Sequence, residues 1–205
     1  MRLLGEMNNC NNPYAAYSCS GARRDADHSA RTFKRAWKRA YLILHGGDVA
    51  AIDARLAALG LPPVRTAARA LPLPQVAFVW APMTGGAPAI SALRPQVYWP
   101  GGKWVDWVGT SFYSRFPNFA GLEPFYRTFA VARRKPFAIA EWAIWGADDP
   151  GFAQRLFGWV AQHSLVRMVS YNQGARRGGI FRLSRYPRAA QAIRRDLRSP
   201  RFLGA

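Results

Sequence analysis

The chain has 205 residues, of which 50% are hydrophobic and 14% are Phe, Trp or Tyr. This content is too high for a disordered basic tail, and no run of 18 apolar residues is present to cross a membrane. Two cysteines are too few for a disulfide-rich scaffold, and the length suits one domain or part of a larger one.

The formal net charge of +18 is typical of nucleic-acid-binding proteins. However, Arg accounts for 25 of the 29 basic residues, and these are spread along the chain without zinc-finger spacing or a heptad repeat. The last thirty residues carry nine Arg and one acidic residue, Asp196. This end of the chain could contact an anionic surface or form a solvated helix face, so a nucleic-acid- or anion-binding module stays open on charge alone.

The first half of the chain alternates apolar segments with stretches rich in Gly, Pro and Asn. The patterns predict a strand over 1–7, a loop over 8–27, a helix over 28–45, a helix over 49–59 and a strand over 75–81. Phe33, Trp37 and Tyr41 recur at helical spacing, and Asp48 is the expected N-cap of the second helix.

The second half repeats strands and helices at short intervals. The expected elements are a helical turn over 103–106, a strand over 107–113, a helix over 121–132, a strand over 135–140, a helix over 150–163, a strand over 166–171 and a helix over 187–197. Five apolar strands separated by helices are typical of a parallel α/β sheet or barrel. No dinucleotide fingerprint or phosphate loop follows any strand, so the pattern does not favour a nucleotide-binding sheet.

The chain contains three Glu, and two of them, Glu6 and Glu141, are expected where a strand ends. The carboxyl ends of parallel strands are where α/β enzymes place their reacting groups. Other polar or aromatic side chains are expected at the same rim: Asn8, Trp80, Tyr113, Trp142 and Asn172. Two carboxyls among aromatic rings are what glycoside hydrolysis requires, although both Glu could instead pair with the plentiful Arg.

Three segments resemble glycoside hydrolase family 26: GEMNN at 5–9, YWPGGKWVDWVGTSFY at 98–113 and KPFAIAEWAIWG at 135–146. The family consists of β-mannanase-like (β/α)₈ barrels that retain anomeric configuration. The resemblance implies that Glu6 is the acid/base, that Glu141 is the nucleophile and that Tyr113 hydrogen-bonds the nucleophile. It further implies substrate contacts by residues that share the rim, namely Asn8, Trp80, Trp142, Trp145 and Asn172.

Two positions depart from the family pattern. Gly5 stands where the family usually has His, and Gly102 stands where an acidic residue is common. A catalytically weak or inactive carbohydrate-binding barrel remnant is therefore an alternative to an active retaining β-1,4-mannanase.

The resemblance also predicts how much of a barrel the chain contains. If Glu6 ends the fourth strand, residues 1–205 hold strands 4 to 8 and form the C-terminal portion of a single catalytic domain. The alternative is that the five strands form a complete small sheet.

The cysteines, the histidines and three of the aspartates carry further expectations. Cys10 and Cys19 could close a disulfide in the loop after Glu6, or could be free thiols. The histidines lack ligand spacing, Asp148 and Asp149 suit a helix N-cap, and Asp106 suits a structural role.

The resemblance implies a polysaccharide or oligosaccharide partner, no metal or cofactor, no nucleic acid, and a secreted or periplasmic location, although the sequence shows no signal peptide. It does not name the polysaccharide or the oligomeric state.

Overall fold

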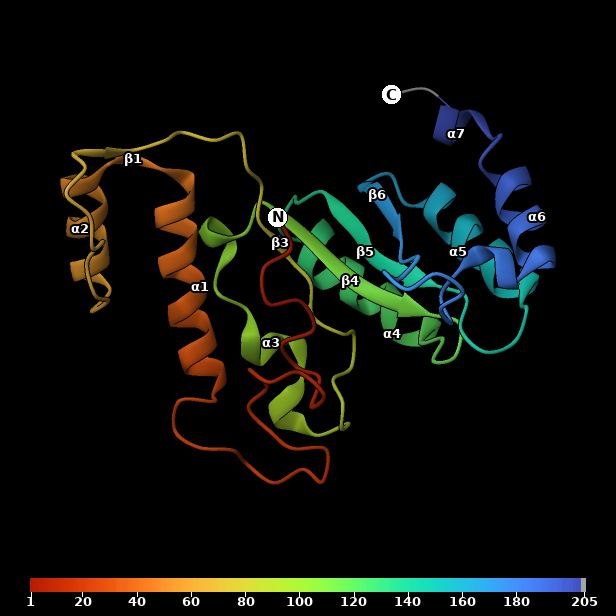
Figure 1. The fold of residues 1–205 in the computed structure, drawn as a ribbon, viewed down its shortest axis with the longest axis horizontal. Coiled ribbons are helices and arrows are strands. Elements are labelled where there is room, and N and C mark those ends of the chain that lie inside the picture. The colour runs from red at the N-terminus through yellow and green to blue at the C-terminus, as the bar shows by residue number, and fades with distance from the viewer. Residues whose placement is uncertain (204–205) are drawn as a thin grey trace. The chain divides into compact units, whose positions relative to one another are not determined.

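The computed structural model describes residues 1–203 and divides into two compact units, a first unit over Met1–Trp107 and a second unit from Val108 onward. Figure 1 labels the elements. The α-helices are α1 (Ala30–His45), α2 (Val49–Ala58), α3 (Pro95–Tyr98), α4 (Phe119–Tyr126), α5 (Pro150–Gln162), α6 (Pro187–Asp196) and α7 (Pro200–Leu203). The strands are β1 (Gly47–Asp48), β2 (Ala70–Leu71), β3 (Val79–Trp80), β4 (Trp107–Tyr113), β5 (Phe137–Ala143) and β6 (Val166–Tyr171).

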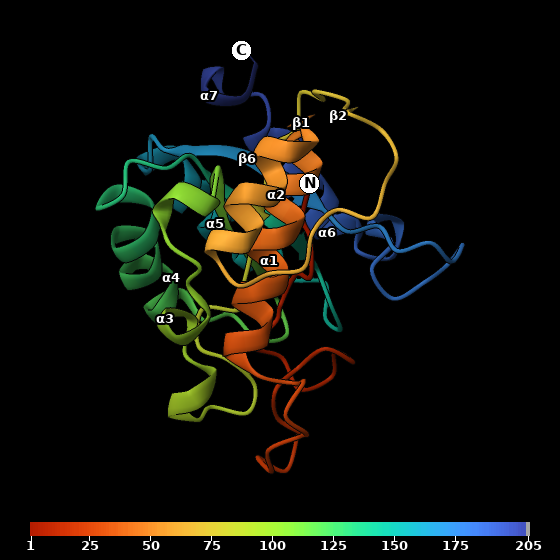
Figure 2. The same ribbon diagram turned by 90° about the vertical axis from the view of Figure 1, so that its left-hand side faces the viewer.

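In the first unit, the two long helices begin and end close to where the sequence predicts. Ser29 caps α1 by accepting a hydrogen bond from the Thr32 N–H, and Gly46 ends the helix with a φ of 72°. The Asp48 side chain caps α2, as expected. The two helices pack against each other, as Figures 1 and 2 show. The short β1–β2 pair beside them was not predicted.

Asp106 links α1 to the segments that lead into β3 and β4. Its Oδ1 accepts a hydrogen bond from the Tyr41 hydroxyl at 2.9 Å, and its Oδ2 accepts from the Phe78 N–H at 2.8 Å. The Nε2 of His45 lies 3.2 Å from the same Oδ2. Burial, followed by the hydrogen bond to Asp106, raises the pKa of Tyr41 to about 12. The predicted structural role of Asp106 is confirmed.

The predicted strand over 1–7 is wrong, and the one over 75–81 is reduced to the two residues of β3. Leu4 and Glu6 have φ values of 46° and 53°, in the left-handed region, and this conformation interrupts an extended strand. Strand-like hydrogen bonds still run from the Val79 N–H to the Met1 carbonyl and from the Glu6 N–H to the Ala81 carbonyl, each at 2.8 Å.

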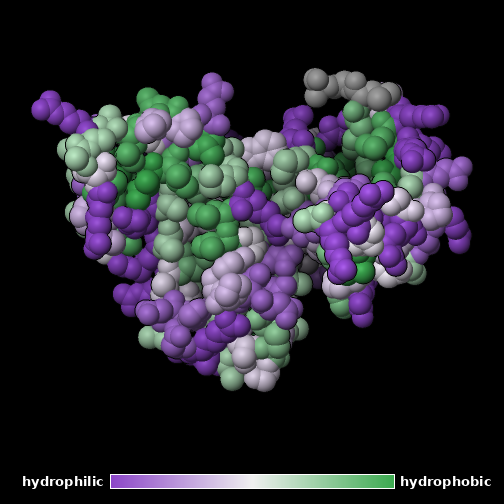
Figure 3. All heavy atoms as spheres, viewed as in Figure 1, coloured by the Kyte–Doolittle hydropathy of each residue, from purple (hydrophilic) through white to green (hydrophobic). Residues whose placement is uncertain are grey.

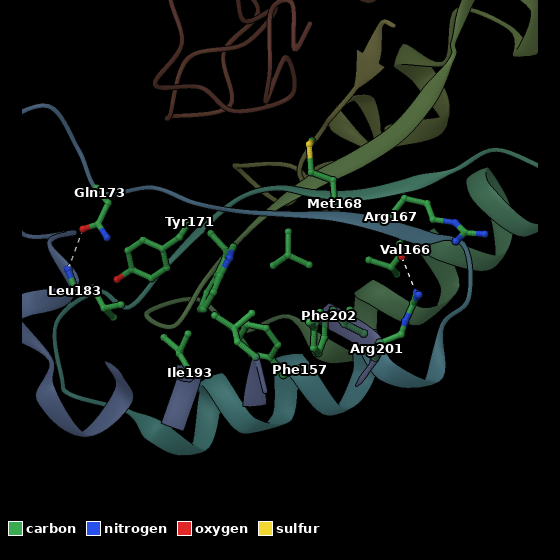
Figure 4. Close-up of a pocket in the computed structure, with 14 residues that line it drawn as sticks. Phe157, Val166, Arg167, Met168, Tyr171, Gln173, Leu183, Ile193, Arg201 and Phe202 are labelled. Carbon is green, nitrogen blue, oxygen red and sulfur yellow. Dashed lines mark hydrogen bonds between the residues drawn. The ribbon is translucent and has the colours of Figure 1, made fainter. Parts of the chain in front are cut away.

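In the second unit, β4, β5 and β6 pair in parallel, with β5 in the centre. Helices α5 and α6 cover one face of this sheet, and hydrophilic side chains lie over α6 on the outside (Figure 3). Figure 4 looks into a groove of about 430 Å³ between β6 and these helices, where Phe157 and Ile193 point toward the sheet. The α/β class with parallel strands is confirmed, while the described residues do not contain the eight parallel strands of a full barrel.

The helix caps of the second unit also follow the prediction. Asp149 caps α5 by accepting from the Phe152 N–H at 2.8 Å. The neighbouring Asp148 accepts from the N–H groups of Arg188 and Ala189 at 2.9 and 2.8 Å, and so caps α6. Both carboxylates therefore stabilise helix N-termini.

Two predicted boundaries in the second unit are wrong. The strand expected over 135–140 continues to Ala143, so Glu141 lies inside β5 and not after it. The helix expected over 121–132 begins earlier, as α4, and continues after Tyr126 as a π-helical turn over Arg127–Val131. Within residues 1–203, no helix combines the length and apolar character needed to cross a membrane.

Glu123, the third glutamate, ties α4 to α5. Its carboxylate accepts hydrogen bonds from Arg127 Nε at 2.6 Å and from Trp159 Nε1 at 3.1 Å, and it lies 2.7 Å from His163 Nε2. Burial works against ionisation here, but the hydrogen bonds outweigh it and hold the pKa of Glu123 below its ordinary value.

We expect Asp106→Ala to lower the free energy of unfolding by about 1–3 kcal/mol, because the Tyr41 hydroxyl and the Phe78 N–H would lose their acceptor. Urea unfolding followed by Trp fluorescence measures this change. Asp27→Ala, an exposed position with the same change in charge, is the matched control. Equal unfolding midpoints for the two variants would contradict the role of Asp106.

We expect Glu123→Gln to be less stable than the wild type above about pH 4.5 and to approach it as the pH falls below that value. A carboxyl whose pKa is lowered by folding stabilises the folded state only while it is ionised, so its contribution is lost on acidification. Thermal unfolding above and below this pH measures the effect. A stability difference that stays constant with pH would show that ionisation of Glu123 plays no part.

Candidate functional site

Three predicted site residues meet at the carboxyl ends of the three parallel strands. The Tyr113 hydroxyl, at the end of β4, donates a hydrogen bond to Oε1 of Glu141 in β5. Asn172 directly follows β6, and its Nδ2 lies 2.9 Å from the Tyr113 hydroxyl oxygen and 3.1 Å from Glu141 Oε1. Each strand thus contributes one polar side chain to a closed hydrogen-bonded triangle.

The strand register explains why these side chains meet. Glu141 is level with Ser111 of β4, and Trp142 is level with Phe112. Because side chains alternate between the faces of a strand, Tyr113 and Glu141 point to one face and Phe112 and Trp142 to the other. The second face is the one that the helices cover.

Trp142 therefore does not lie with the other predicted site residues. It is 2% exposed, and its ring centroid lies 4.8 Å from that of Tyr171 and 5.6 Å from that of Phe157. Its place in the apolar layer between the sheet and α5 argues against the predicted sugar contact.

An aromatic cluster borders the Glu141 triangle. Trp145, in the loop after β5, is fixed by the Ser114 hydroxyl, which accepts from its N–H at 2.8 Å. Its ring lies 5.7 Å from that of Tyr113, 5.6 Å from that of Phe116 and 5.3 Å from that of Phe181. Trp145 thus lies beside the triangle, as predicted, whereas Phe116 and Phe181 were missed.

Phe116 could have been found from its place three residues after the end of β4, and it is 62% exposed. Phe181 is far from any strand end in sequence and gives no such signal. The guanidinium of Arg115 lies 5.2 Å from the Trp145 ring centroid, so this side of the cluster is cationic.

In the first unit, Glu6 lies in a tight turn after the N-terminal segment. Its Oε2 accepts a hydrogen bond from Asn9 Nδ2, and its carbonyl accepts from Asn12 Nδ2, both at 2.8 Å. Arg2 Nη2 lies 3.7 Å from Glu6 Oε1, and the Glu6 side chain is 17% exposed. Asn9, which orients the carboxylate, was missed because an Asn in a loop carries no periodic signal.

Asn8 and Trp80 have different surroundings from those predicted. Asn8 is fully buried: its Nδ2 donates to the carbonyls of Met83 and Leu93, and its Oδ1 accepts from the Met83 N–H. These bonds give Asn8 a structural role in the loop. Trp80 is also buried, edge-on to the partly exposed Trp99 with ring centroids 4.8 Å apart. Of these two indoles, Trp99 is the one accessible to solvent.

The loop after Glu6 is held at both ends. Cys10 and Cys19 form a disulfide bond, with 5.0 Å between their Cα atoms. The guanidinium of Arg24 donates to the carbonyls of Cys10, Asn12 and Pro13 at 2.9, 3.2 and 2.8 Å. Since Asn12 also binds the Glu6 carbonyl, the disulfide loop and the Glu6 turn form one connected structure.

Over the part of the chain that the structure describes, no group of three or more His, Cys, Asp or Glu side chains is arranged to hold a metal ion. The chemistry available at the Glu141 triangle and the Glu6 turn is that of carboxylates, a phenol and amides.

Comparison with known proteins gives a likeness of fold. The sequence matches no protein-family profile and no curated protein. Among solved structures, the mannanase BCman of Bacillus subtilis is similar, with a TM-score of 0.51 and 17% sequence identity. The match covers 94% of this chain and 45% of the mannanase chain, so this chain spans less than half of that protein's length. The α/β fold is therefore of the kind found in a mannanase.

We expect reduction of the Cys10–Cys19 disulfide to speed tryptic cleavage in the loop over 10–24. Without the cross-link, the open form of the loop gains conformational entropy worth roughly 2–3 kcal/mol, so the loop opens to the protease more often. Mass spectrometry of timed digests, with and without reductant, measures the effect. The double variant Cys10→Ser/Cys19→Ser should be cut quickly under both conditions. Cleavage of the wild type at the same rate with and without reductant would show that the disulfide does not constrain the loop.

Proposed function

We propose that the chain is the C-terminal portion of a retaining glycoside hydrolase of family 26 type, acting on a β-1,4-linked polysaccharide such as mannan. The observation that carries the proposal is the triangle of Glu141, Tyr113 and Asn172 at the carboxyl ends of β4, β5 and β6. A carboxylate that is held by two donors and bordered by aromatic rings suits attack on a sugar ring.

In the proposed reaction, a carboxylate oxygen of Glu141 attacks the anomeric carbon and the glycosidic C–O bond breaks. Glu6 donates a proton to the leaving oxygen, and a covalent glycosyl ester forms on Glu141. Glu6 then takes a proton from water, which attacks the anomeric carbon and breaks the ester bond. Two displacements at one carbon retain its configuration.

Tyr113 and Asn172 position the nucleophile in this scheme. Tyr113 donates to Oε1 of Glu141, and Asn172 donates both to that oxygen and to the Tyr113 hydroxyl. Rotation of the carboxylate would therefore break hydrogen bonds from two neighbouring strands. A nucleophile that is held in place loses little entropy on reaching the reactive geometry.

The aromatic cluster is assigned to sugar binding. The partly exposed ring of Trp145 and the exposed ring of Phe116 offer flat apolar faces to the C–H groups of a sugar, next to the proposed nucleophile. We therefore keep Trp145 as a proposed sugar contact. Asn8 and Trp142 are no longer proposed as sugar contacts, because both side chains are buried.

The Cys10–Cys19 disulfide supports an oxidising, exported location for the protein, secreted or periplasmic. Such a location agrees with a polymeric substrate found outside the cell.

We expect Glu141→Ala and Glu6→Ala each to abolish hydrolysis of manno-oligosaccharides. Tyr113→Phe should lower kcat/KM roughly 10- to 100-fold, because one hydrogen bond to a charged group is lost. Reducing-sugar release at neutral pH measures all three variants. Glu123→Gln is the matched control, since it removes the third carboxylate away from the triangle and should leave activity intact.

Azide tests the two assigned roles separately. With an activated aryl glycoside, azide should restore turnover of Glu141→Ala and give a glycosyl azide of inverted configuration. With Glu6→Ala, it should give one of retained configuration. Wild-type turnover by Glu141→Ala would refute the assignment, and sugar binding by the wild type without turnover would indicate the carbohydrate-binding remnant instead.

A further inference from the structure

The outer face of α6 carries a row of arginines that the proposed reaction does not use. Arg188, Arg194 and Arg195 of α6 and Arg198, which lies just after its end, are all exposed, while the opposite face of the helix packs against α5 through residues such as Ile193. With Gln191 and with Gln154 of α5, these arginines line a shallow hollow between the two helices. We call these four residues the α6 arginine face, and Figure 3 shows hydrophilic side chains over this helix.

The charge of this face is mostly uncompensated. Among the described residues, Arg195 pairs with Asp196 at 3.3 Å, but no carboxylate lies within ion-pair distance of the Arg188, Arg194 or Arg198 side chains. The nearby Asp148 is used by backbone N–H groups at the start of α6. Arg194 and Arg195 lie in the last turn of α6, where cations favour the helix dipole, whereas Arg188 lies in the first turn, where a cation is unfavourable.

The length of the face suits an extended ligand. Arg188 and Arg195, in the first and last turns of α6, are separated by about 10 Å along the helix at 1.5 Å per residue. A polymer with repeated anionic groups can contact guanidinium groups in both turns at once. Guanidinium groups bind carboxylates through two parallel hydrogen bonds, and this geometry favours carboxylates spaced along a chain.

The other lining residues favour a polysaccharide over a nucleic acid. The amides of Gln154 and Gln191 can donate to and accept from hydroxyl groups. The hollow has no aromatic lining residue, so it offers no platform on which unpaired bases could stack.

The start of α6 is tied to the loop that follows β5. Helix α5 follows β5 through the loop over 144–149, and Asp148 of that loop binds the first turn of α6. Glu141 points to the face of the sheet that the helices do not cover. The arginine face is therefore a site apart from the proposed reacting groups.

We propose that the α6 arginine face binds an acidic polysaccharide, one with uronic acid carboxylates along its chain. The site holds the polymer by charge and by hydroxyl contacts, apart from the reacting bond. That the face binds a polyanion is argued from its charge alone. That the polyanion is a polysaccharide rests on the proposed function.

Affinity electrophoresis in gels containing polygalacturonate tests the proposal at about 20 mM salt, where charge interactions are weakly screened. The wild type should be strongly retarded, and Arg188→Gln/Arg194→Gln/Arg198→Gln should bind about tenfold more weakly or worse. The matched control is Arg31→Gln/Arg65→Gln/Arg69→Gln, which removes the same charge from exposed positions of the first unit and should bind like the wild type. Methyl-esterified polygalacturonate should retard none of the three proteins.

Equal weakening in the two triple variants would show that net charge alone attracts the polymer and would overturn the site. Tighter binding of single-stranded DNA than of polygalacturonate, lost in the α6 variant, would replace the polysaccharide with a nucleic acid. Glu141→Ala should bind polygalacturonate like the wild type. Loss of hydrolysis therefore reports on the proposed function, and loss of retardation on the α6 arginine face.

Discussion

The register between β5 and its two parallel neighbours determines which side chains of the second unit can act together. Glu141 lies level with Ser111, and Trp142 lies level with Phe112 and Tyr171. A shift of one residue would place a carboxylate in the apolar layer against α5 and an indole among the polar groups, which is costly on both faces. Burial of Trp142 under the helices thus stabilises the orientation of Glu141, and packing on one face of the sheet fixes the chemistry on the other.

Much of the second unit could be predicted from sequence because its strands are short, apolar and bounded by turn residues. The bounds of β4 and β6 agree with the expectation, and Tyr113 and Asn172 follow from those bounds. The error at Trp142 arose because the expected strand stopped at residue 140, which placed both Glu141 and Trp142 in a loop. Once the strand continues to Ala143, alternation alone assigns the two residues to opposite faces.

The first unit was harder to predict because loop conformation dominates it. The pattern of residues 1–7 resembles a strand, yet left-handed residues at Leu4 and Glu6 break it, and apolar content gives no warning of this. Asn9 and Phe181 contact predicted site residues through turns whose paths depend on tertiary contacts. The helices, in contrast, were predicted well, since Ser29 and Asp48 cap them through local hydrogen bonds.

The backbone of Glu6 has a consequence for which side chain suits this position. An L-residue with a φ of 53° is strained by roughly 1 kcal/mol or more, and glycine would relieve that strain. The turn is already closed by backbone bonds to Ala81 and Asn9, neither of which requires a glutamate side chain. At position 6, folding therefore balances the strain of a left-handed L-residue against the hydrogen bond from Asn9 and the Arg2 contact that only a carboxylate makes.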